Sequence, residues 1–80
     1  MLSLSPNPAR DRVTIGLHFD KELQARITLL DMTGRPLQTQ NLSMRHGSIV
    51  FELSSLPKGI YLVQLFANDQ ILATKRLIKE

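Results

Sequence analysis

The feature that most constrains the fold is a strict alternation of apolar and polar residues near the start of the chain. Between positions 12 and 19 every second residue is apolar, namely Val13, Ile15, Leu17 and Phe19. A period of two places successive side chains on opposite sides of an extended backbone. The pattern therefore predicts a β-strand with one buried side and one side facing solvent.

Three further segments carry strand signals. Ser48–Leu53 alternates in the same way, with its apolar side chains on one face. Gly59–Phe66 is apolar on both faces, which is typical of a central strand with neighbours on both sides. Ile71–Ile78 is expected to be a last strand, although its inward-facing phase is not evident. Turn-forming residues separate the strands at Asp31–Gly34, Arg45–Gly47, Leu56–Gly59 and Asn68–Gln70.

The segment Asp20–Met32 has two interpretations. As a helix, it would begin at Asp20 as N-cap and carry a stripe of apolar side chains. As a strand over Gln24–Asp31, it would turn Ala25, Ile27 and Leu29 inward. We favour the strand, because a glycine turn and a second extended run, Leu37–Leu42, follow it and predict a hairpin.

Six or seven short strands at regular turn spacing predict an antiparallel, all-β sandwich. Eighty residues make one domain, residues 1–80, with a small core. No apolar run approaches the roughly 20 residues that span a bilayer, so we expect no membrane insertion. The first five residues are too short for a secretory signal, which in an exported protein would lie upstream in a longer precursor.

The sequence contains no recognisable active site, and we expect neither an enzyme nor a cofactor. It lacks cysteine, which removes thiolate catalysis and cysteine zinc sites together. His18 and His46 are expected at the surface, on a polar strand face and in a turn. The aspartates near strand ends are typical of turn caps. The net charge of +3 comes from basic residues scattered among acidic ones, as on a solvated surface.

Nucleic-acid binding is also disfavoured. A five-stranded oligonucleotide-binding barrel fits the strand count, but such proteins stack bases on exposed aromatic side chains. The four aromatic residues of this chain occupy strand positions and look like core: Phe19, Phe51, Tyr61 and Phe66. The sequence therefore predicts no nucleic-acid partner.

Three short motifs lie at the turns. In Pro6-Asn7-Pro8 the prolines restrict the backbone, and Asn7 is expected to bond its own following backbone in a rigid corner after a short strand, Leu2–Ser5. In Asp31–Arg35, Gly34 supplies a positive φ while Asp31 accepts hydrogen bonds from turn amides. In Leu56–Tyr61 the chain turns at Pro57 and Gly59 and places Tyr61, whose hydroxyl needs a partner, in the central strand.

In this order, and followed by a basic and apolar end, the motifs resemble the C-terminal sorting domain of the type IX (Por) secretion system of Bacteroidetes. That family carries P-N-P-A, D-x-x-G-R, L-x-x-G-x-Y and a terminal K-x-[LIV]-[LIV]-K. The matching residues are Pro6, Asn7, Pro8, Ala9, Asp31, Gly34, Arg35, Leu56, Gly59, Tyr61, Lys75, Leu77, Ile78 and Lys79. One departure is Ser5, where the family often has an aromatic residue.

The resemblance implies a seven-stranded, immunoglobulin-like sandwich without catalytic chemistry, linked covalently to an upstream cargo. The cargo would cross the periplasm, and the outer-membrane secretion machinery would recognise the domain and deliver the cargo to the cell surface or the medium. A sortase-like peptidase would usually remove the domain, near or upstream of Met1, and often join the cargo to anionic lipopolysaccharide. On this view Pro6-Asn7-Pro8 marks where the cargo linker ends.

The family further implies that the machinery reads the last strands and the tail, Lys75–Glu80. An edge strand can be extended by β-augmentation, so we expect the tail to offer its backbone, and isolated domains to be able to pair through their edges. The alternative is an accessory immunoglobulin-like module for adhesion or carbohydrate binding. The identity of the cargo, the cleavage site and the oligomeric state do not follow from the sequence.

Overall fold

A computed structural model describes residues 2–80, except for the side chain of residue 44. The chain forms five strands: β1 (Leu2–Ser5), β2 (Arg12–Asp31), β3 (Pro36–Glu52), β4 (Gly59–Ala67) and β5 (Gln70–Lys79). All strand pairings are antiparallel and belong to one sheet. The described residues contain no helix. The predicted all-β, antiparallel class is confirmed, and the helical interpretation of Asp20–Met32 is wrong.

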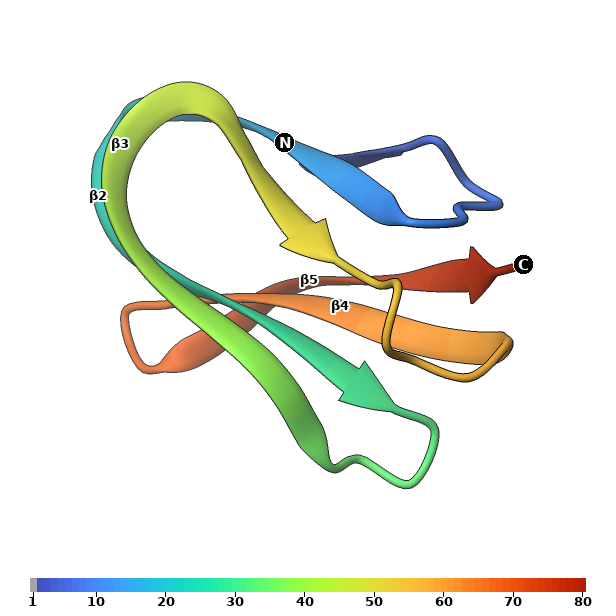
Figure 1. Ribbon diagram of the computed structural model, residues 1–80. Coiled ribbons are helices and arrows are strands. Elements are labelled where there is room, and N and C mark those ends of the chain that lie inside the picture. The colour runs from blue at the N-terminus through green and yellow to red at the C-terminus, as the bar shows by residue number, and fades with distance from the viewer. Residues whose placement is uncertain (1) are drawn as a thin grey trace.

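The two longest strands, β2 and β3, bend together and fold the sheet back on itself (Figure 1). The bend coincides with a break in their register. His18 lies opposite His46, but the next pair is Leu23 with residue 44, so residues 19–22 of β2 face a single residue of β3. Such a bulge increases the local twist and bends the strand.

The bend corrects two of the predicted boundaries. The sequence ends one strand at Phe19, begins the next at Gln24 and places a turn at Arg45–Gly47, yet β2 and β3 continue through these segments. The polar residues Asp20–Glu22 and Arg45 instead occupy the bulge, where both strands change direction, whereas Gly47 pairs regularly with Leu17 beside it. Counting both halves of the bent strands recovers seven extended segments from five strands.

The folded sheet forms two layers that face each other (Figure 1). The first layer consists of β1, residues 12–18 of β2 and residues 46–52 of β3. The second layer consists of residues 36–44 of β3, residues 23–31 of β2, β4 and β5. Where the sequence predicts a sandwich, the structure has one continuous, curled sheet that makes both layers.

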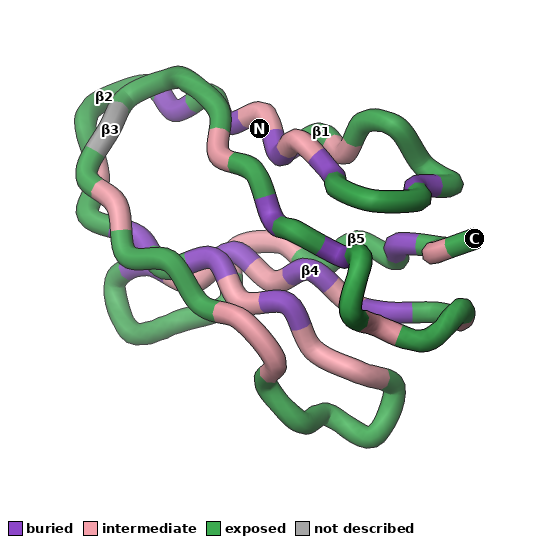
Figure 2. Tube along the Cα trace, viewed as in Figure 1, coloured by how far each residue is buried: buried purple, intermediate pink, exposed green. Residues whose placement is uncertain are grey.

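The core lies between the layers and follows the predicted alternation (Figure 2). Val13, Ile15 and Leu17 are buried in the first layer, together with Phe51, and Phe19 is buried at the bulge. In the second layer the buried side chains are Ala25, Ile27, Leu29, Tyr61, Val63, Leu65, Ala67 and Leu77. The prediction that Ala25, Ile27 and Leu29 point into the core is confirmed. The predicted central position of β4, between β2 and β5, is confirmed as well.

An irregularity in β5 explains why its phase is not evident from the sequence. Ala73 lies opposite Leu65, but the next partner of β4, Phe66, lies opposite Ile71. Leu72 is therefore an extra residue that shifts the alternation by one position. After it, Ala73 and Leu77 contribute to the core, whereas Ile71 before it is exposed. No single period of two fits the whole strand.

Candidate functional site

The Pro6-Asn7-Pro8 motif binds the tail, Lys75–Glu80, from the other end of the chain. The side-chain amide of Asn7 donates to the carbonyl of Arg76 at 3.0 Å, and its Oδ1 accepts from the amide of Ile78 at 3.0 Å. Ala9 continues the contact: its amide donates to the Ile78 carbonyl at 2.8 Å, and its carbonyl accepts from the Glu80 amide at 2.7 Å. The expected bond of Asn7 to its own following backbone is replaced by this long-range pairing.

The position of the corner also corrects the view that it marks the end of a cargo linker. β1 precedes the corner and pairs with β2 from Leu2↔Leu17 to Ser5↔Thr14. Leu2 itself is buried in the core. The folded sheet therefore begins before Pro6, and the corner instead carries the chain from β1 across to the tail. The expected cleavage point near Met1 lies outside the described residues.

The Asp31–Arg35 turn has the predicted geometry. Asp31 Oδ1 accepts from the Thr33 hydroxyl at 2.6 Å, the Thr33 amide at 2.9 Å and the Arg35 amide at 3.0 Å. The Arg35 guanidinium lies 3.3 Å from Oδ2, and Gly34 has a φ of 89°. The hydrogen bond from the Thr33 side chain, followed by that from the Arg35 amide, holds the pKa of Asp31 below its usual value. The turn requires an ionised carboxylate for its full stability.

The third motif anchors the start of β4. Gly59 begins the strand with a φ of 154°, in a region that side chains with a Cβ rarely adopt. Two residues later, Tyr61 is buried, and its hydroxyl donates to the carbonyl of Pro57. The buried hydroxyl is thus hydrogen-bonded, and this bond connects the turn at Pro57 to strand β4.

All the motif segments meet at one end of the molecule (Figure 1). Across the second layer Asp31 lies opposite Tyr61, and Tyr61 lies opposite Leu77. Alongside, Gly59 lies opposite Lys79, which in turn bridges to Ala9. Motifs that are far apart in sequence therefore contact one another through paired strands and form one continuous structure.

The motif residues divide by exposure into structural and accessible groups. Tyr61 and Leu77 are buried, and Asp31, Gly59 and Lys79 are half-buried. The exposed members are Pro6, Asn7, Pro8, Gly34, Arg35, Lys75 and Ile78. Only side chains of the second group are open to a partner without unfolding of the domain. Ile60 and Arg76, which occupy variable positions of the third motif and of the terminal motif, are exposed near Ile78.

Sequence reasoning missed the proximity of the two histidines. His18 and His46 lie opposite each other on β2 and β3, and their ring centroids are 6.3 Å apart. Both are exposed, as expected. Within residues 2–80 no cluster of three potential metal ligands exists. Two imidazoles supply half the ligands of a closed tetrahedral zinc site, so the pair alone does not make a metal centre.

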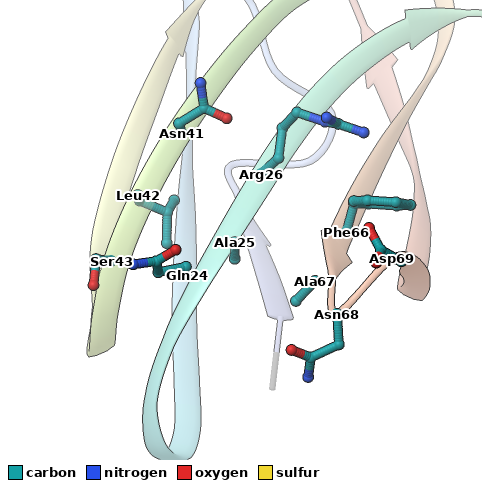
Figure 3. A pocket seen from close by; sticks show the side chains of 10 residues that line it. All are labelled: Gln24, Ala25, Arg26, Asn41, Leu42, Ser43, Phe66, Ala67, Asn68 and Asp69. Carbon is teal, nitrogen blue, oxygen red and sulfur yellow. The ribbon is translucent and has the colours of Figure 1, made fainter.

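A hollow beside the β4–β5 turn is lined mainly by polar side chains (Figure 3). The Arg26 guanidinium carbon lies 4.4 Å from the centroid of the Phe66 ring, a cation–π contact. Phe66 is therefore half-buried on the outer face, and its assignment to the core is wrong. The hollow is open, and the hydroxyl of Ser43 in its lining donates to Glu22 Oε1 at 3.3 Å.

Comparisons with known proteins agree with the assembled motifs. No helix within residues 2–80 is long and apolar enough to cross a membrane. No curated protein matches the chain. The family model of the secretion system C-terminal sorting domain matches residues 3–80, which include every motif described above. The chain therefore belongs to the family of type IX secretion system C-terminal sorting domains.

Proposed function

We propose that this chain is the sorting domain of a larger precursor, with its cargo attached upstream of Leu2. The cargo crosses the periplasm, and the outer-membrane machinery recognises the domain and exports the cargo to the cell surface or the medium. A sortase-like peptidase then removes the domain and joins the cargo to anionic lipopolysaccharide. The domain itself performs no reaction and holds no cofactor.

The observation that carries this proposal is the match of the family model to almost the whole chain, residues 3–80. The geometry supports it, because the motifs meet at one end of the fold, where Asn7 and Ala9 bind the tail. The accessory-module alternative is weaker: Tyr61, Phe19 and Phe51 are buried, and Arg26 lies over the half-buried Phe66. The surface therefore lacks the free aromatic platform typical of a carbohydrate-binding module.

The test is export of a fluorescent reporter that carries a periplasmic signal peptide and is fused upstream of residues 2–80. The fusion is expressed in a secreting Bacteroidetes strain with the type IX pore intact or deleted. We expect reporter at the surface or in the medium only when the pore is present. Reporter that stays in the periplasm of both strains would contradict the proposal and favour the accessory module.

A truncation lacking Leu77–Glu80 should leave the reporter in the periplasm. The truncation also removes a core side chain, because Leu77 is fully buried, and it removes the partners of Ala9. Its effect therefore combines lost recognition with lost stability. A thermal melt of the truncated domain separates the two, and normal export of the truncated fusion would contradict a role for the tail.

A further inference from the structure

The two outer faces of the folded sheet differ in character. On the first layer the outward pairs are polar: Arg12 and Glu52 form an ion pair at 3.7 Å, and His18 lies opposite His46. Val50 is the one exposed large apolar residue there among those described. This face has the composition expected of a solvated sheet surface.

On the second layer, apolar side chains of three adjacent strands are neighbours on the outer face. Ile60 on β4 lies opposite Ile78 on β5, and they are 42% and 41% exposed. Leu62 follows on β4, between Arg76 of β5 and Leu30 of β2. We call these five residues the tail face: Leu30, Ile60, Leu62, Arg76 and Ile78. Single exposed apolar side chains are ordinary, but contiguous ones mark interaction sites.

The charged residue of the tail face is basic. Among the outward positions of the second layer, the described charged residues are Arg76 and, further along, Arg26. Neither guanidinium takes part in an ion pair within residues 2–80, where the three ion pairs use Arg10, Arg12 and Arg35. Carboxylates reach this side of the sheet only away from the tail face, within the described residues: Asp69 lines the hollow that contains Arg26, and Glu22 accepts a hydrogen bond from the Ser43 hydroxyl at 3.3 Å. Within the tail face, the unpaired guanidinium of Arg76 is complementary to an acidic group of a partner.

The backbone of the tail is not available to a partner. On one side β5 pairs with β4 from Gly59↔Lys79 onward. On the other side Asn7 and Ala9 occupy the carbonyl of Arg76, both polar groups of Ile78 and the amide of Glu80. β-Augmentation requires an open edge, and along residues 76–80 this edge is closed in the folded domain. A partner that reads the folded tail must therefore contact side chains on its outer face.

We propose that the tail face is the docking surface for a protein component of the outer-membrane secretion machinery whose contact surface is apolar at its centre and acidic at its rim. This inference rests on the proposed sorting function. Ile60, Leu62 and Ile78 supply the apolar contact, and Arg76 pairs with a carboxylate of the partner. The partner recognises side chains. The hydrogen bonds of Asn7 and Ala9 hold the tail in place beside β4, so that these side chains keep their positions on the outer face.

The experiment uses the reporter fusion described above with substitutions on the two outer faces. Ile60→Ser, Ile78→Ser and Arg76→Glu should each lower exported reporter at least tenfold, whereas Arg76→Lys should retain at least half. The matched controls are Val50→Ser, because Val50 is also 42% exposed, and Arg45→Glu. Both controls should be exported like the unchanged chain. Melting temperatures of the purified 80-residue variants within a few degrees of each other exclude misfolding as the cause.

The outcomes separate this inference from the sorting function. If the unchanged fusion is not exported, both fail. If it is exported and the three tail-face variants are exported equally well, the docking surface is wrong while the sorting function stands. Equal loss with Arg76→Lys and Arg76→Glu would contradict an acidic partner.

Two other occupants of the tail face are tested with the purified chain. Binding to phosphatidylglycerol vesicles that Arg76→Glu abolishes would replace the protein partner with a lipid surface. A dimer that Ile60→Ser converts to a monomer in size-exclusion chromatography would replace it with a second copy of the chain. A monomer that ignores the vesicles, combined with the export losses above, is the result that supports the proposal.

Discussion

Asn7 connects the two ends of the chain through a single side chain. Its amide group offers a donor and an acceptor spaced like those of a peptide bond, so it pairs with Arg76 and Ile78 as a neighbouring strand would. Each such bond contributes about 0.5–1.5 kcal/mol. The tail is therefore held in place although chain ends usually fray.

Replacing Asn7 by alanine should destabilise the domain by about 1–2 kcal/mol, because two hydrogen bonds are lost. For a domain of this size that lowers the melting temperature by roughly 4–16 °C. The amides of Ile78 and Glu80 should exchange faster with solvent, which hydrogen exchange measures. Asn7→Asp keeps the acceptor for the Ile78 amide, so its melting temperature should lie between those of Asn7→Ala and the unchanged chain. Unchanged exchange at both amides in Asn7→Ala would contradict the pairing.

Asp31 makes the stability of its turn depend on pH. Its pKa is lowered in the folded chain, chiefly by the Thr33 side-chain hydrogen bond, so the carboxylate stabilises the fold when ionised. That contribution is complete above the ordinary pKa of the unfolded chain, about 3.9, and is lost as the pH falls through the lowered folded value. Asp31→Asn should therefore have a lower melting temperature than the unchanged chain at pH 7. The difference between the two melting temperatures should become smaller below about pH 4. A gap independent of pH would contradict the assignment.

At the scale of the element, Gly59 shows how one position permits a strand to begin. A Cβ at this residue would meet open space, so the constraint is the φ of 154° and not crowding. Gly59→Val should cost about 1–3 kcal/mol through backbone strain. The matched control is Lys58→Val, the exposed neighbour, whose melting temperature should change little. Equal melting temperatures for Gly59→Val and the unchanged chain would show that the strand start tolerates a side chain.

The bent strands show the limit of reading elements from local patterns. Asp20–Glu22 and Gly47 carry turn-forming residue types, and local propensity alone ends a strand there. The strand continues because β2 and β3 bend at the same place and pair with each other on both sides of the bend. Pairing with a neighbour thus overrides local propensity, as it commonly does in sheets.

At the scale of the whole molecule, one core joins both layers. Phe51 from the first layer is buried in the same cluster as Tyr61, Val63 and Leu65 from the second. Because each layer covers the apolar face of the other, neither can bury its side chains alone. The two layers should therefore unfold together.

Phe51→Ala tests this cooperativity. Removing a fully buried phenylalanine costs about 3–5 kcal/mol, a large part of the stability of a small domain. The chain has one tyrosine and no tryptophan, so its intrinsic fluorescence reports Tyr61 in the second layer. The fluorescence and circular dichroism transitions should shift together to lower temperature. Val50→Ala is the exposed control, and a Tyr61 transition that stays in place would show that the layers unfold independently.

The sequence by itself determined the strand class, the inward set of each regular strand and the local turns. Alternation in residues 12–19 and hydrogen bonding around Asp31 depend on neighbours a few positions apart, which a linear pattern contains. The family also followed from the sequence, because its motifs are short and local.

Only the tertiary structure decided what meets across the chain. The pairing of Asn7 with the tail, the continuity of the bent strands and the phase of β5 depend on where the folded sheet places distant backbone groups. The difference between the two outer faces arises in the same way, since Ile60, Ile78 and Leu30 become neighbours only when β2, β4 and β5 pair. Local sequence encodes which side of a strand is apolar, but the choice of partner strand is a property of the whole sheet.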